Sequence, residues 1–157
     1  MKRIIILFIC IFIICSCEKK EQINIQEYYL TYNSIDIKPG AMFSTVAISL
    51  DDYNNTHSET SDYNENTANI YEYDNFEIET FYGEDGIEKI YSVRLTNENQ
   101  PTNEGVKIGD NIDNMLDIYG SDYINVDDSI YLYTIDNTNI SFTIENNYIV
   151  EIVYYLV

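Results

Sequence analysis

Apolar residues follow two patterns along the chain: one continuous run near the start, and short stretches of alternation through the rest. The run covers Ile4–Ile14 without a polar break. The alternating stretches, such as Ile70–Tyr73 and Phe76–Phe81, are rich in β-branched and aromatic residues, and turn-forming residues such as Gly83–Gly86 separate them. This alternation predicts antiparallel strands.

Two segments have the spacing of an amphipathic helix instead. Apolar residues recur at helical intervals over residues 42–50 and again over residues 112–119. The second segment has clear ends, because Gly109–Asn111 supplies capping residues before it and Gly120 supplies a stop after it. The first segment has no closing glycine, so its end is less well defined. The polar stretch 51–69 predicts a long exposed loop.

Segments in the first half of the chain also resemble segments in its second half. Ile70–Tyr73 matches Ile130–Tyr133 at an offset of 60 residues, and Ile87–Ile90 matches Ile149–Ile152 at an offset of 62. The alternative is chance similarity in a chain rich in Ile, Tyr and Asn. We predict an α+β fold in which two tandem helix-plus-antiparallel-hairpin repeats form one antiparallel sheet, with the helices packed on one face. The repeats would occupy residues 27–96 and 105–157, joined by a linker over 97–104.

The apolar run near the start has the length of the hydrophobic region of a signal peptide. It holds eleven residues, whereas a helix that spans a membrane needs about 20. It follows Lys2 and Arg3 and ends in Ile-Cys-Ser-Cys at residues 14–17, which resembles a bacterial lipobox. An ordinary cleaved signal and an uncleaved anchor are the alternatives.

The lipobox resemblance implies a lipoprotein. Residues 1–16 would be a signal peptide, Cys17 would carry the lipid, with palmitate among its acyl chains, and residues 17–26 would be a tether. It therefore implies a location at the cell membrane, lipid-anchored on the extracytoplasmic face, where two acyl chains hold a protein stably.

A second resemblance covers the body. Glu104–Gly120 is similar to a turn–helix–turn segment of beta-lactamase-inhibitor-protein-like proteins and of the small lipoprotein of the outer-membrane β-barrel assembly machinery. The layout of the whole chain resembles that of clostridial surface lipoproteins. These resemblances imply an antiparallel sheet with helices on one face, and binding to other proteins rather than catalysis.

The charge of the chain limits its partners. Eight Lys and Arg stand against 27 Asp and Glu, for a net charge of −19, so nucleic acid is not an expected partner. The stretch Ile108–Val157 contains no Lys or Arg and nine acidic residues. Such a region is either a solubilising surface or a landing site for a basic partner.

The sequence contains few residues in patterns typical of catalytic or metal-binding sites. The single histidine, His57, lies in the predicted polar loop, and no nucleophile, metal or phosphate-binding motif occurs. Acidic residues are plentiful, but their spacing selects neither a catalytic pair nor a calcium loop. We therefore predict no enzyme activity, no catalytic or metal-binding residues and no cofactor. The alternative function is a cell-surface protein that binds a cation or small ligand through its acidic loops.

Tyrosine is the remaining compositional feature, with 16 residues. Tyr71 and Tyr73 match Tyr131 and Tyr133, and Tyr155 lies in the last predicted strand. Tyrosine is enriched at interfaces, although β-propensity alone also places it in sheets. These five residues form the predicted interaction surface of a non-catalytic protein-binding module whose partner the sequence does not identify.

Overall fold

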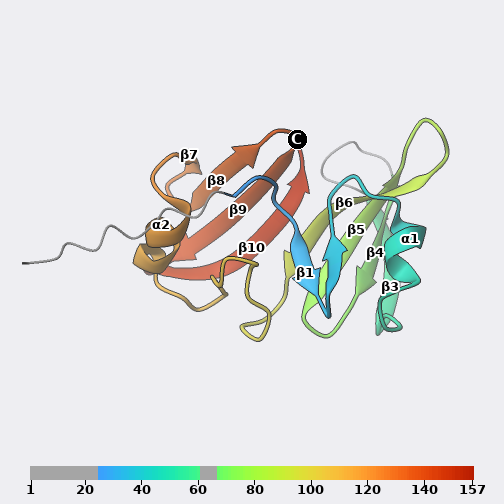
Figure 1. Ribbon diagram of the computed structural model, residues 1–157, viewed down its shortest axis with the longest axis horizontal. Coiled ribbons are helices and arrows are strands. Elements are labelled where there is room, and N and C mark those ends of the chain that lie inside the picture. The colour runs from blue at the N-terminus through green and yellow to red at the C-terminus, as the bar shows by residue number, and fades with distance from the viewer. Residues whose placement is uncertain (1–24, 61–66) are drawn as a thin grey trace, which may run out of the picture.

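The computed structural model describes residues 25–60 and 67–157, and its main feature is one large antiparallel sheet (Figure 1). The sheet has eight strands in the order β3-β4-β5-β6-β10-β9-β8-β7. Its strands are β3 (Asn55–Thr60), β4 (Thr67–Glu72), β5 (Phe76–Tyr82), β6 (Glu88–Leu95), β7 (Ile124–Asp127), β8 (Ile130–Ile135), β9 (Thr138–Glu145) and β10 (Tyr148–Leu156). A separate hairpin, β1 (Leu30–Tyr32) and β2 (Ile35–Ile37), and two helices, α1 (Phe43–Ala47) and α2 (Ile112–Tyr119), complete the fold.

The middle of the sheet joins the two halves of the chain. Strands β3–β6 follow one another in the first half and β7–β10 in the second, and β6 pairs with β10. In that pair Val93 stands opposite Tyr154, and Ser92 stands opposite Tyr155. One continuous sheet therefore runs from β3 to β7.

The predicted α+β class, with two helix-plus-hairpin repeats and a helical layer, is wrong. Among the described residues the structure is mostly β, with 49% in strands and 10% in helices. The first helix holds only five residues and the second eight. Each half contributes four strands to the sheet. In the first half, part of the expected polar loop forms β3, and in the second half Ile124–Asp127 forms β7. Backbone pairing with β4 holds β3 in place, and this needs no apolar pattern in the sequence.

The hydrophobic core lies on one face of the sheet. A row of paired residues crosses the middle strands as Ile78, Val93, Tyr154 and Ile140, all with 0–1% of their surface exposed. Leu30 and Ile37 of the hairpin, Phe43 and Val46 of α1, and Met115 and Tyr119 of α2 belong to the same cluster. The hairpin lies between the two helices in Figure 1. Hairpin and helices together cover this face.

A glycine precedes each helix and ties it to the sheet. The Gly40 amide donates to the Ile90 carbonyl at 2.7 Å, and the Gly109 amide donates to the Ile149 carbonyl at 2.8 Å. Both glycines have left-handed backbone angles, with φ of 86° and 90°. This conformation is unfavourable for residues with a side chain.

We expect Gly109→Ala to lower the free energy of unfolding by about 1–2 kcal/mol, the cost of a left-handed backbone for alanine. Gly40→Ala should lower it further, because an added Cβ would lie 3.2 Å from Leu156 Cδ2, whereas at Gly109 the nearest atom is 3.9 Å away. Chemical denaturation of the two variants measures the difference. A larger loss for Gly109→Ala than for Gly40→Ala would contradict this account.

Candidate functional site

The sheet face opposite the core carries polar and charged side chains. Side chains alternate between the two faces along a strand. The residues next to a core residue in the same strand therefore lie on this second face, together with the residues paired with them across the sheet. We call this second face the open face. Two rows of residues paired across the strands lie on it: His57, Ile70, Glu79, Ser92 and Tyr155 in one row, and Asn55, Glu72, Glu77, Arg94 and Val153 in the other.

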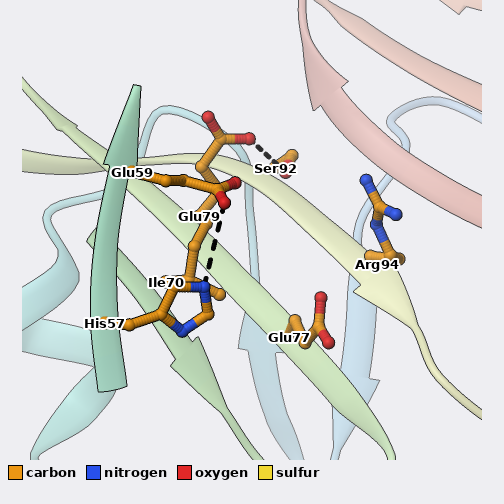
Figure 2. A pocket seen from close by; sticks show the side chains of 7 residues that line it. All are labelled: His57, Glu59, Ile70, Glu77, Glu79, Ser92 and Arg94. Atoms are coloured by element: carbon orange, nitrogen blue, oxygen red, sulfur yellow. Dashed lines mark hydrogen bonds and ion pairs between the residues drawn. The ribbon is translucent and has the colours of Figure 1, made fainter. Parts of the chain in front are cut away.

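Two adjoining hollows shape the open face. The first, of about 200 Å³, is lined by His57, Glu59, Ile70, Glu77, Glu79, Ser92 and Arg94 (Figure 2). The second, of about 310 Å³, shares Glu59, Glu79, Ser92 and Arg94 with the first and adds Tyr91, Val153 and Tyr155. The shared residues make the two hollows one shallow groove across β3–β6 and β10.

Close contacts between polar side chains surround the groove. His57 Nδ1 lies 3.3 Å from Glu72 Oε1, and His57 Nε2 lies 3.9 Å from Glu59 Oε2. Ser92 Oγ donates to Glu79 Oε2 at 3.1 Å. Exposed ion pairs of this kind contribute little stability, about 0–1 kcal/mol.

The groove is acidic on balance. Glu59, Glu77 and Glu79 line the first hollow, and Arg94 is its one Lys or Arg residue. Arg94 Nη1 lies 2.9 Å from Glu151 Oε1, and Glu151 is a residue outside the groove lining. The groove therefore offers carboxylate oxygens to a cationic group.

The structure places four of the five predicted interaction tyrosines on the core side. Tyr71 stacks on Phe43 with ring centroids 4.1 Å apart, and Tyr73 stacks on Phe76 at 4.8 Å. Tyr131 packs against the core, and Tyr133 is 3% exposed. The register explains the placement, because Tyr71 stands opposite Ile78 and Tyr133 stands opposite Ile140 in the core row.

The environment of these tyrosines fits a structural role. Tyr133 Oη donates to the Gly120 carbonyl at 2.8 Å, and Tyr71 Oη donates to Glu88 Oε1 at 3.1 Å. Burial, with a smaller contribution from Tyr53, raises the pKa of Tyr73 to about 12. These hydroxyl groups therefore remain protonated at neutral pH.

Tyr155 is the predicted tyrosine that lies on the open face. It stands opposite Ser92 and lines the second hollow. The charged groove residues His57, Glu59, Glu77, Glu79 and Arg94 were not among the predicted site residues. Glu77 and Glu79 alternate with the buried Phe76 and Ile78, so the strand pattern itself marks them as residues of the opposite face.

The predicted lipidation residue, Cys17, lies outside the described residues, as do the proposed signal peptide and most of the tether. Within residues 25–60 and 67–157, no group of three or more His, Cys, Asp and Glu side chains is arranged to hold a metal ion. No helix in the same ranges is long and apolar enough to cross a membrane.

No family model, curated protein or solved structure matches the chain. The resemblance to surface lipoproteins and to beta-lactamase-inhibitor-protein-like proteins therefore stays a prediction. The remaining indications of function are the lipobox-like motif and the shape and charge of the open face.

Proposed function

We propose that this protein is a lipid-anchored, extracytoplasmic, non-catalytic binding module that contacts a protein partner through the open face. The observation that carries the proposal is the shallow acidic groove, formed by side chains of five adjacent strands on one face of the sheet. Acyl chains on Cys17 would hold the domain at the membrane, and the tether would let the face reach a neighbouring protein.

The shape of the groove favours a protein partner over an enclosed small ligand. Sites for small molecules are commonly cavities of about 300–1,000 Å³ with mostly apolar walls. The hollows here, of about 200 and 310 Å³, are below this range and at its lower end. Carboxylates and other polar groups provide most of their lining. Such a surface suits the side chains of an opposing protein surface.

The charge of the groove selects the kind of partner. Carboxylates outnumber the cationic groups in the lining, and the whole chain has a net charge of −19. Complementary charge speeds association and disfavours acidic partners. We infer a partner that presents lysine or arginine residues to the groove.

Photo-crosslinking tests the proposal in the native membrane. We would replace Tyr155 of the full chain by p-benzoylphenylalanine, and use Tyr53 as the matched aromatic control. Tyr53 is 45% exposed and contacts Tyr71 on the core side. We expect a discrete protein adduct from position 155 and none from position 53. Equal adducts from both positions, or none from position 155, would contradict the proposal.

Reversing charge in the groove should remove the same adduct. With p-benzoylphenylalanine at position 155, the double change Glu77→Lys and Glu79→Lys is expected to lower the adduct yield at least about tenfold, because like charges would then face the partner. An unchanged yield would show that the carboxylates do not select the partner.

A further inference from the structure

One edge of the sheet is open and apolar. Strands β3 and β7 lie at opposite ends of the sheet (Figure 1), so each has a neighbouring strand on only one side among the described residues. All four residues of β7 are exposed, and Ile124 and Val126 are 60% and 58% exposed. The residues of β3 are exposed but polar. Edge strands are commonly protected by Lys, Pro, charged residues, bulges, short length or a covering segment. Strand β7 contains neither Lys nor Pro, but it is four residues long, ends in Asp127 and has a bulge between Asn125 and Asp127.

The pairing of β7 connects this edge to the open face. Ile124 stands opposite Leu132, Leu132 opposite Ser141, and Ser141 opposite Val153. Val153 stands opposite Arg94 in the open face. A strand added beside β7 would therefore extend this row and place its own alternate side chains against Ile124.

The turn after β7 holds the edge in position. Asp127 Oδ1 accepts hydrogen bonds from the Ser129 amide and hydroxyl, both at 2.8 Å, and from the Ile130 amide at 3.0 Å. These bonds to the ionised form lower the pKa of Asp127. Asp127 is therefore ionised at neutral pH and accepts all three hydrogen bonds, which support the turn at the end of β7.

Charge decides which occupant fits. The stretch Ile108–Val157, which contains β7, has nine acidic residues and no Lys or Arg. Asp122, Asp127 and Asp128 lie within or beside the edge strand. A second copy of the chain would bring the same negative charge against this edge. An extended segment with lysine or arginine side chains would instead meet complementary charge.

We propose that β7 accepts an extended basic segment of a partner protein as a ninth strand of the sheet. The four residues of β7, which include a bulge between Asn125 and Asp127, offer at most about 13 Å of edge without a partner strand among the described residues, at about 3.3 Å per residue. Backbone hydrogen bonds would supply the pairing, and apolar residues of the segment would cover Ile124 and Val126. The proposal rests on the protein-binding role, but it uses a surface distinct from the acidic groove.

The test is direct binding to the full chain in detergent micelles. The probe is a fluorescent synthetic peptide of about ten alternating valine and lysine residues, followed by fluorescence anisotropy at about 150 mM salt, where long-range charge attraction is screened. A second peptide has the same sequence with alternate backbone amides methylated, which keeps the charge but removes hydrogen-bond donors along one edge. We expect the methylated peptide to bind at least about tenfold more weakly.

Two double variants of the chain give the matched comparison. Ile124→Lys with Val126→Lys should weaken the unmethylated peptide at least about tenfold. Tyr148→Lys with Val150→Lys adds the same charge on the interior strand β10, where these residues are 53% and 41% exposed. This control should change affinity less than about threefold. Circular dichroism of both variants verifies that the sheet is retained.

Three results would overturn the proposal. Equal affinity for the two peptides would mean that charge alone drives binding. Equal weakening by the two double variants would mean that the edge is not the site. A dimer of the parent chain that the Ile124→Lys and Val126→Lys changes dissociate would mean that a second copy fills the edge. Crosslinking from position 155 tests the groove separately, so failure at the edge leaves that result intact.

Discussion

Replacing Cys17 by serine is expected to abolish the incorporation of labelled palmitate into the chain. The lipobox resemblance implies that the lipid is joined through the sulfur of Cys17, and the thiolate is the nucleophile that cysteine supplies. A serine hydroxyl does not take its place. Metabolic labelling followed by immunoprecipitation gives an all-or-none readout.

Cys15 provides the matched control for this experiment. It lies two residues before Cys17 and would leave with the signal peptide. Cys15→Ser should therefore retain full labelling. Loss of label from Cys15→Ser, or label remaining on Cys17→Ser, would contradict the proposed anchor. The result also bears on the proposed function, because two acyl chains are what keeps the domain stably at the membrane.

Replacing Phe142 by alanine is expected to lower the free energy of unfolding by about 3–5 kcal/mol, as for other fully buried phenylalanines. Phe142 is 0% exposed, and its ring lies 5.0 Å from that of Tyr119 and 6.0 Å from that of Tyr133. It stands between Tyr131 of β8 and Ile152 of β10. The substitution would leave a cavity where α2 meets three strands. Because whole domains are stable by about 5–15 kcal/mol, the loss is a large fraction of the total.

Chemical denaturation measures the effect of this substitution. Phe81→Ala is the matched control, because Phe81 lies on β5 with a partly exposed side chain and a ring 6.3 Å from that of Tyr91. We expect a clearly smaller loss for Phe81→Ala. An equal loss for the two variants would show that Phe142 is not a central residue of the core.

Several elements of the fold could be predicted because their causes are local. The second helix ends where the capping residues indicated: Asn111 Oδ1 accepts from the Asp113 amide at 2.9 Å, and the Gly120 amide donates to the Leu116 carbonyl at 3.0 Å. Strand β5 (Phe76–Tyr82) lies on the alternating stretch Phe76–Phe81. Capping and alternation depend on neighbouring residues, so the sequence contains them directly.

Other elements depend on partners far away in the chain. Strand β3 has no apolar alternation, and its pairing with β4 supplies its order. Because such polar residues are typical of loops, no local pattern predicts this strand. Its edge position also brings His57 beside Glu72 and Glu59 at the groove, so the groove was missed together with the strand.

The sequence by itself determined the strand segments that have apolar alternation, the second helix, the acidic balance and the lipobox resemblance. In β4, only the tertiary structure decided which face of the strand is buried. Alternation separates Tyr71 and Tyr73 from Ile70 and Glu72, but both sets contain residues that fit a core or a surface. Register with β5 places Tyr71 beside Ile78 in the core and Ile70 beside Glu79 in the groove. The physical reason is that one sheet face is covered by the hairpin and helices, and this choice is made by long-range packing rather than by any local pattern.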